Sequence, residues 1–154
     1  MTIPANLVDL IGHWRSTNRL WLSPADPVHE SGSTMLVAPA AQGRFITLQY
    51  TWDYEGDPQD GLLMLGVKPH PVAVKAVWID SWHMQDNYML SEETNGEQGE
   101  IFLTGSYAVP PGPDWGWKIE IIPRLPDEFQ LLMYNLSPEG TSHLAVQTGY
   151  IRKE

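Results

Sequence analysis

A strict two-residue alternation of side chains constrains the fold of this chain more than any other feature. Between Arg44 and Tyr54, every second position holds a large apolar or aromatic side chain, in the order Ile46, Leu48, Tyr50, Trp52 and Tyr54. The positions between them are mostly polar, with Thr47, Gln49, Thr51 and Asp53. Because successive side chains of a strand point to opposite faces, this pattern predicts an antiparallel strand with one buried face.

Glycine and proline divide the rest of the chain into short segments of the same kind. With 13 glycines and 13 prolines, no segment keeps an apolar stripe of helical period over several turns. A short helical turn is expected only at Pro4–Leu10, with Leu7, Leu10 and Ile11 on one side. We predict about ten strands, at Gly12–Leu22, Gly32–Ala38, Arg44–Tyr54, Gly61–Val67, Val74–His83, Asn87–Glu92, Glu100–Tyr107, Trp115–Ile122, Glu128–Leu136 and Ser142–Arg152.

Short turns rich in Gly, Pro, Asn and Asp connect these segments, so consecutive strands should pair as antiparallel neighbours. Closing such a meander removes its exposed edges. We therefore predict one all-β domain over residues 1–154, a closed up-and-down barrel. A two-sheet sandwich has the same local signals and is the alternative fold.

The two ends of the chain carry paired motifs, Gly12-His13-Trp14 in the first expected strand and Tyr150-Ile151-Arg152 in the last. This pairing resembles the calycin superfamily, which includes lipocalins and fatty-acid-binding proteins. In that superfamily the tryptophan plugs the closed end of the barrel and a basic side chain lies across it. The resemblance therefore implies that Trp14 and Arg152 form a barrel plug, held in part by cation–π attraction.

Further motifs, Gly43-Arg44-Phe45 and Trp78-Ile79-Asp80-Ser81, resemble a bacterial group of uncharacterised calycin-like domain proteins. This chain differs from the fatty-acid-binding proteins at a residue that binds their ligand. Fatty-acid-binding proteins place a carboxylate-binding Arg two residues before a Tyr in the last strand, where this chain has Thr148. His143 lies in a stretch that resembles the haem-ligating segment of nitrobindins, so haem is an alternative ligand, although the nitrobindin glycine-rich motif is missing after Trp14.

The chain has seven Trp, six Tyr and three Phe, and such large aromatic side chains are suited to lining a cavity. Alternation along Val74–His83 puts Asp80 on one face with Trp78 and Trp82, and puts His83 on the other. A carboxyl between two indoles is either a structural hydrogen-bond acceptor or an acid or base. The predicted ligand-binding residues are Tyr50, Trp52, Trp78, Asp80, Trp82, His83, Tyr107, Trp117, Tyr134 and His143.

The leading hypothesis is a non-enzymatic barrel that binds a small hydrophobic or aromatic molecule. The alternatives are a nitrobindin-like haem or gas-binding barrel, an isomerase or hydratase that uses Asp80, and a structural barrel filled by its own side chains. No catalytic residue is assigned. The histidines have no metal-binding spacing, and no serine-hydrolase motif is present.

The charge of the chain limits the partners that it is expected to bind, and its cysteine content indicates its compartment. Nineteen acidic against nine basic residues give a net charge of −10, which repels nucleic acid and anionic membrane surfaces. The chain has no cysteine, which favours a reducing cytoplasm. It shows neither a secretory signal nor an apolar run long enough for a membrane span. We expect a cytoplasmic monomer or homodimer.

Overall fold

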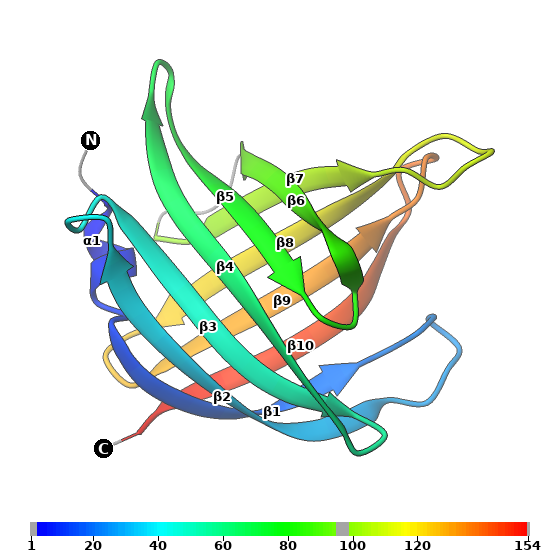
Figure 1. Ribbon diagram of the computed structural model, residues 1–154, viewed down its shortest axis with the longest axis horizontal. Coiled ribbons are helices and arrows are strands. Elements are labelled where there is room, and N and C mark those ends of the chain that lie inside the picture. Colours follow the sequence, from blue (N-terminus) through cyan, green and yellow to red (C-terminus); the bar gives the residue numbers. More distant parts are fainter. Residues whose placement is uncertain (1–2, 95–98, 154) are drawn as a thin grey trace.

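In the part of the chain that the computed structural model describes, residues 3–94 and 99–153, ten antiparallel strands form a closed barrel. Each strand pairs with the next in sequence, and β1 pairs with β10 (Figure 1). The closed up-and-down barrel is confirmed, and the sandwich alternative is wrong. The elements are α1 (Ala5–Val8), β1 (Gly12–Leu20), β2 (His29–Ala40), β3 (Phe45–Tyr54), β4 (Asp57–Pro69), β5 (Val72–Asp80), β6 (Met84–Thr94), β7 (Ile101–Tyr107), β8 (Trp115–Arg124), β9 (Glu128–Leu136) and β10 (Ser142–Arg152).

Strand β3 shows how the alternating pattern builds the barrel. Its apolar and aromatic positions from Ile46 to Trp52 are buried, whereas Gln49 and Thr51 between them are exposed. Leu48 packs opposite Leu63 of β4 and Val37 of β2, both buried. The pattern that predicted the strand therefore also determines which of its faces lines the interior.

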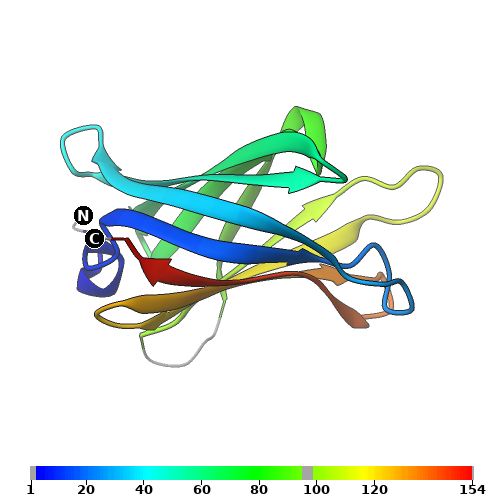
Figure 2. The same ribbon diagram turned by 90° about the horizontal axis from the view of Figure 1, so that it is seen from below.

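The short helix closes one end of the barrel. Leu7 of α1 and Leu10 just beyond it are fully buried, because they pack into the end of the core. Ile11 was expected on the same side, but it lies between α1 and β1 and 38% of it is exposed. Figure 2 shows α1 at this end, beside the end of β10.

Trp14 and Arg152 meet at the same end, as the resemblance implied. The two residues are partners in the β1–β10 register, and the guanidinium lies 4.2 Å from the centre of the indole ring. The Trp14 indole N–H donates to Leu10 O at 2.8 Å. Arg152 donates to the carbonyl oxygens of Asp9, Ile11 and Pro126 at 2.9 to 3.1 Å. Arg152 thus ties β10 to the helical segment and to the β8–β9 turn.

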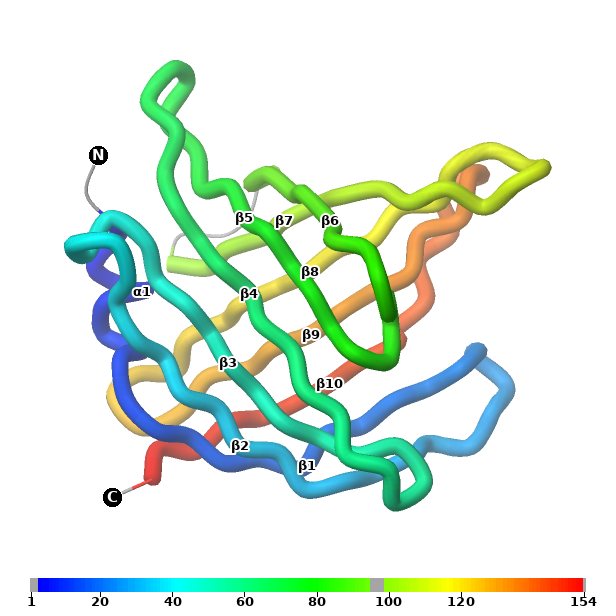
Figure 3. The backbone as a smooth tube through the Cα atoms, viewed as in Figure 1, coloured from blue at the N-terminus to red at the C-terminus, as the bar shows by residue number. Residues whose placement is uncertain are grey.

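Aromatic side chains fill the barrel above this plug. The Phe129 ring lies edge-on to Trp14 at 4.7 Å and stacks on Tyr150 at 5.0 Å. The Tyr150 hydroxyl is 2.8 Å from the Ser33 hydroxyl, and burial raises the pKa of Tyr150 to about 12. The β1–β2, β3–β4, β5–β6, β7–β8 and β9–β10 connections lie toward the opposite end (Figure 3).

Candidate functional site

Asp80 is the last residue of β5, and its carboxylate is buried inside the barrel, with 3% of the residue exposed. Oδ2 accepts hydrogen bonds from the Tyr50 hydroxyl at 2.7 Å and from the Trp52 indole N–H at 3.2 Å. Oδ1 accepts from the backbone N–H groups of Trp82 at 2.9 Å and His83 at 3.0 Å. Four donors compensate the burial of the charge, which favours the interpretation of Asp80 as a structural acceptor.

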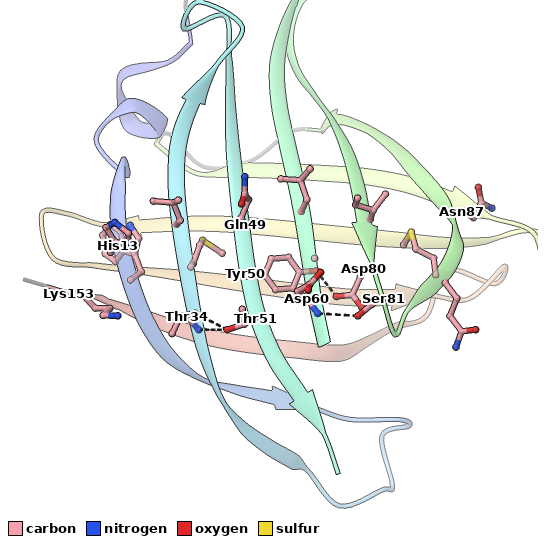
Figure 4. A pocket seen from close by; sticks show the side chains of 18 residues that line it. His13, Thr34, Gln49, Tyr50, Thr51, Asp60, Asp80, Ser81, Asn87 and Lys153 are labelled. Atoms are coloured by element: carbon pink, nitrogen blue, oxygen red, sulfur yellow. Dashed lines mark hydrogen bonds between the residues drawn. The ribbon is translucent and has the colours of Figure 1, made fainter. Parts of the chain in front are cut away.

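Gly61 makes the bond between Tyr50 and Asp80 possible. Tyr50, Gly61 and Asp80 lie in register on three neighbouring strands. A Cβ atom at position 61 would overlap the phenol of Tyr50 and would lie 2.9 Å from Ile79 O. Because glycine has no side chain, the phenol crosses β4 and reaches the carboxylate (Figure 4).

The Tyr50 hydroxyl also accepts a hydrogen bond from the Trp78 indole N–H at 2.8 Å. Burial and the neighbouring Asp80 carboxylate raise the pKa of Tyr50 well above its ordinary value of 10.0. The phenol therefore stays protonated and remains a donor. Trp78, Tyr50 and Asp80 form a continuous chain of hydrogen bonds inside the barrel.

The turn after Asp80 corrects the predicted placement of His83. The strand was expected to continue to His83, which would put this residue on the outer face with Ser81. Instead β5 ends at Asp80, whose carboxylate holds the next turn through two backbone N–H groups. The turn directs His83 back to the lumen side, against Trp78. The expected opposition of Asp80 and His83 is therefore wrong.

His83 packs among four indole rings, with centroid distances of 4.8 to 5.8 Å from Trp52, Trp78, Trp82 and Trp117. Trp78 and Trp117 stack on each other at 5.4 Å, 13° from parallel. Burial lowers the pKa of His83 from its ordinary 6.5, and the Asp80 carboxylate only partly opposes this effect. The imidazole is thus neutral at neutral pH.

A pocket of about 500 Å³ leads from the surface to this aromatic cluster. It opens between β6 and the β7–β8 connection, because β6 pairs with β7 only from Ser91 to Thr94. We call it the β6–β7 pocket. Its volume lies in the range of small-molecule sites. Its wall is formed mainly by large apolar and aromatic side chains, those of Trp78, Met84, Tyr88, Met89, Tyr107 and Trp117, with His83, Asn87, Ser106, Ala108 and Asp114 between them.

Two buried polar side-chain atoms have no hydrogen-bond partner in the described part of the chain: Trp117 Nε1 and Ser91 Oγ. Trp117 is 7% exposed and lines the β6–β7 pocket. A buried donor without an acceptor costs about 1–3 kcal/mol. Such atoms in a folded protein call for an explanation, and a ligand that supplies an acceptor is one.

His143 faces the interior because of a β-bulge. The β9–β10 register shifts between Leu144 and Val146, so His143 pairs with Asn135, which in turn pairs with the inward-facing Trp117. Without this extra residue, His143 and Tyr150 would lie on opposite faces. His143 does not line the β6–β7 pocket. The haem alternative, which needs an open pocket at His143, stays a prediction.

Tyr107 and Tyr134 were both predicted to line the lumen, and the structure separates them. Tyr107 lines the β6–β7 pocket, and its hydroxyl donates to Asn135 Oδ1 at 2.6 Å. Tyr134 lies on the outer face, where Lys118 Nζ is 5.5 Å from its ring. The expected position of Tyr134 is therefore wrong, because the inward set of β9 holds the odd-numbered Phe129, Leu131 and Met133.

Sequence reasoning missed Gly61, Ser91 and seven residues of the wall of the β6–β7 pocket, which are Met84, Asn87, Tyr88, Met89, Ser106, Ala108 and Asp114. Met89 and Ser91 stand at alternate positions of the expected strand Asn87–Glu92, which puts them on one face. Nothing in the local sequence shows that this face is the inner one. The role of Gly61 depends on which residues lie beside it on β3 and β5.

A second hollow, of about 850 Å³, lies along β2 to β5 (Figure 4). Many of its lining side chains are exposed residues of the outer face, and polar groups there bond to each other. The Thr34 and Thr51 hydroxyls are 2.7 Å apart, and the Asp60 N–H donates to Ser81 Oγ at 3.1 Å. Neither unpartnered buried atom belongs to this hollow. The β6–β7 pocket is therefore the stronger candidate.

Within residues 3–94 and 99–153, no group of three or more His, Asp or Glu side chains could hold a metal ion. In the same part of the chain, no helix is long and apolar enough to cross a membrane.

The fold and the site define a ten-stranded antiparallel barrel that is filled at its α1 end and has a pocket at its side. The chain belongs to the DUF1579 family, described as "Protein of unknown function", whose family model matches residues 5–152. No curated protein matches the chain.

Solved structures share the fold. One is Rv2717c from M. tuberculosis, with a TM-score of 0.63, 15% sequence identity and complete coverage of both chains. Another is the S-type phycobiliprotein lyase CPES from Guillardia theta, with a TM-score of 0.68 and 16% identity over all of this chain and 94% of that one. At this level of identity the likeness shows the fold alone, which fits a calycin-like barrel.

Proposed function

We propose that this protein binds a small, uncharged, largely aromatic molecule in the β6–β7 pocket. The observation that carries the proposal is at Trp117, a residue of the pocket wall whose buried indole N–H has no acceptor among the described residues. A ligand with a hydrogen-bond acceptor at its edge satisfies this donor. The barrel shared with the phycobiliprotein lyase supports the proposal at the level of architecture.

The rest of the pocket favours the same class of ligand. The large rings and the two methionines supply apolar surface, worth roughly 25 cal/mol for each Å² removed from water. The stacked Trp78–Trp117 pair and the neutral His83 offer flat faces to an aromatic ring. The pocket wall includes Asp114 but no Lys or Arg. Together with a net charge of −10, this disfavours anions such as fatty acids.

Hydrogen bonding at Asp80 supports a binding role over acid–base catalysis. Both carboxylate oxygens are held by donors of the protein itself, two side chains and two backbone groups. Asp80 does not line the β6–β7 pocket. A general base must reach the proton that it abstracts, and Asp80 instead fixes the turn that positions His83.

Titration with the uncharged dye N-phenyl-1-naphthylamine tests the proposal, because its fluorescence rises when it enters an apolar site. We expect saturable binding of one dye molecule per chain. Ala108 is an exposed residue that lines the pocket, so Ala108→Trp should block the site. The matched control is Ala25→Trp, in the exposed β1–β2 connection. Equal dye binding by wild type and Ala108→Trp, or no saturable binding, contradicts the proposal.

A further inference from the structure

The two unpartnered polar atoms belong to one row of the barrel. Ser91 of β6 is in register with Gly105 of β7, and Gly105 is in register with Trp117 of β8. Ser91 and Trp117 are 6% and 7% exposed. At about 4.8 Å between neighbouring strands, their Cα atoms are separated by about 10 Å. Each side chain carries a hydrogen-bond donor, and a single compact molecule spans the distance between them.

Met89 covers the position between these two donors. Gly105 has no side chain, and a Cβ atom there would lie 3.0 Å from both Cγ and Sδ of Met89. Met89 is 6% exposed and forms part of the pocket wall. An unbranched thioether chain changes rotamer at low cost and adapts to different neighbours. Met89 is thus a side chain able to move that lies in the pocket wall beside Gly105, whereas Ser91 does not line the β6–β7 pocket.

We propose that the β6–β7 pocket extends beneath Met89 to Ser91, and that its ligand is a flat, uncharged compound with acceptors at two opposite edges, as in a quinone or an aromatic diketone. One acceptor takes the Trp117 indole N–H, and the other takes the Ser91 hydroxyl once Met89 has moved aside. This inference rests on the proposed function and deepens it by specifying the class of ligand.

The inference accounts for both buried atoms with one molecule. An indole N–H only donates, so its partner must be an acceptor, and a serine hydroxyl also donates to a carbonyl oxygen. In a site of low polarity each such bond is stronger than it would be in water. A compound without acceptors leaves both donors unsatisfied and gains only apolar burial.

Equilibrium dialysis distinguishes a ligand with acceptors from one without them. The two probes, 1,4-naphthoquinone and naphthalene, share one ring skeleton and differ in the two carbonyl groups. The chain has no cysteine, so the quinone is not lost by addition to thiols. We expect wild type to bind the quinone at least about tenfold more tightly than naphthalene. Trp117→Phe and Ser91→Ala each remove one donor, and each should lower the ratio of quinone affinity to naphthalene affinity by about fivefold to tenfold.

Ser91→Ala deletes a polar atom that has no partner, so this variant should fold as wild type does, whereas Trp117→Phe also removes buried ring volume and should lose some stability. The matched controls are Trp115→Phe and Ser23→Ala, at residues outside the wall of the β6–β7 pocket, and both should keep the wild-type preference for the quinone. Equal affinity for the two probes overturns the inference, and a Ser91→Ala variant with wild-type quinone affinity overturns the extension beneath Met89. Both results leave the proposed function intact if the naphthylamine dye still binds and Ala108→Trp still blocks it. If the naphthylamine dye does not bind, the proposed function is contradicted as well.

Discussion

The Tyr50 hydroxyl bonds to the Asp80 carboxylate at 2.7 Å across an intervening strand, over the bare backbone of Gly61. This contact links the inner face of β3 to the end of β5. It also helps to satisfy a buried charge whose other oxygen holds the turn that carries His83. The position of the aromatic cluster therefore depends on a polar network rather than on apolar packing alone.

Substitution of Gly61 by alanine should disrupt this network. The new methyl group would overlap the Tyr50 phenol and press on Ile79 O, so we expect a loss of about 2–3 kcal/mol of unfolding free energy, measured by urea denaturation. Gly32→Ala is the control, because a Cβ atom there meets nothing within 4 Å. The control should change stability by less than about 0.5 kcal/mol. Equal stability of the two variants would show that Tyr50 does not need the space at Gly61.

Removal of the Tyr50 hydroxyl should be costly for two reasons. Tyr50→Phe takes a donor from Asp80 and leaves the Trp78 indole N–H without its acceptor. We expect a loss of about 2–4 kcal/mol in the free energy of unfolding. Tyr88→Phe, at a residue 61% exposed, should be nearly neutral. If both variants unfold at the wild-type urea concentration, the network does not stabilise the barrel.

Replacement of Arg152 by lysine should destabilise the barrel. Its guanidinium reaches three carbonyl oxygens while lying on Trp14, a geometry that an ammonium group cannot reproduce. We expect Arg152→Lys to lower the unfolding free energy by about 2 kcal/mol, as measured by thermal or urea denaturation. Arg15→Lys, on the outer face of the same end of β1, provides the comparison. If Arg152→Lys loses no more unfolding free energy than Arg15→Lys, Trp14 alone forms the plug.

His83 should make the stability of the barrel depend on pH. Burial places its folded pKa below the ordinary 6.5, so the unfolded chain takes up the proton first. The neutral His83 imidazole contributes fully to the free energy of unfolding above pH 6.5. This contribution is lost as the pH falls below 6.5 toward the folded pKa of His83. His83→Phe keeps an aromatic ring and should lose less stability than wild type between about pH 7 and pH 5.5. Urea denaturation at both pH values, with pH 8 as the baseline, measures the difference, and identical losses would contradict this account.

The fold was predictable because the evidence for it is local. The alternation in β3, the turn residues between segments and the Gly12-His13-Trp14 motif each depend on neighbours in sequence. Consecutive pairing and closure then follow from short connections and the need to protect edges. The contact between Trp14 and Arg152 came from the resemblance rather than from any pattern in the residues alone.

The site was less predictable because single irregularities change which side chains face inward. One extra residue near Ala145 turns His143 toward the lumen, and the end of β5 at Asp80 does the same for His83. Strand alternation carries no signal for either event. Tyr134 shows the converse, since its aromatic ring suggested the lumen whereas its place in β9 puts it outside.

The most direct test of the central claim, a ligand pocket at Trp117, is an NMR titration of the tryptophan indole N–H signals with 1,4-naphthoquinone. The Trp117 signal, assigned from Trp117→Phe, should move downfield as its free N–H gains an acceptor. The Trp14 signal should stay in place, because that N–H already bonds to Leu10 O at the filled end. A Trp117 signal that stays unchanged at saturating quinone, or a larger shift at Trp14, would contradict the account.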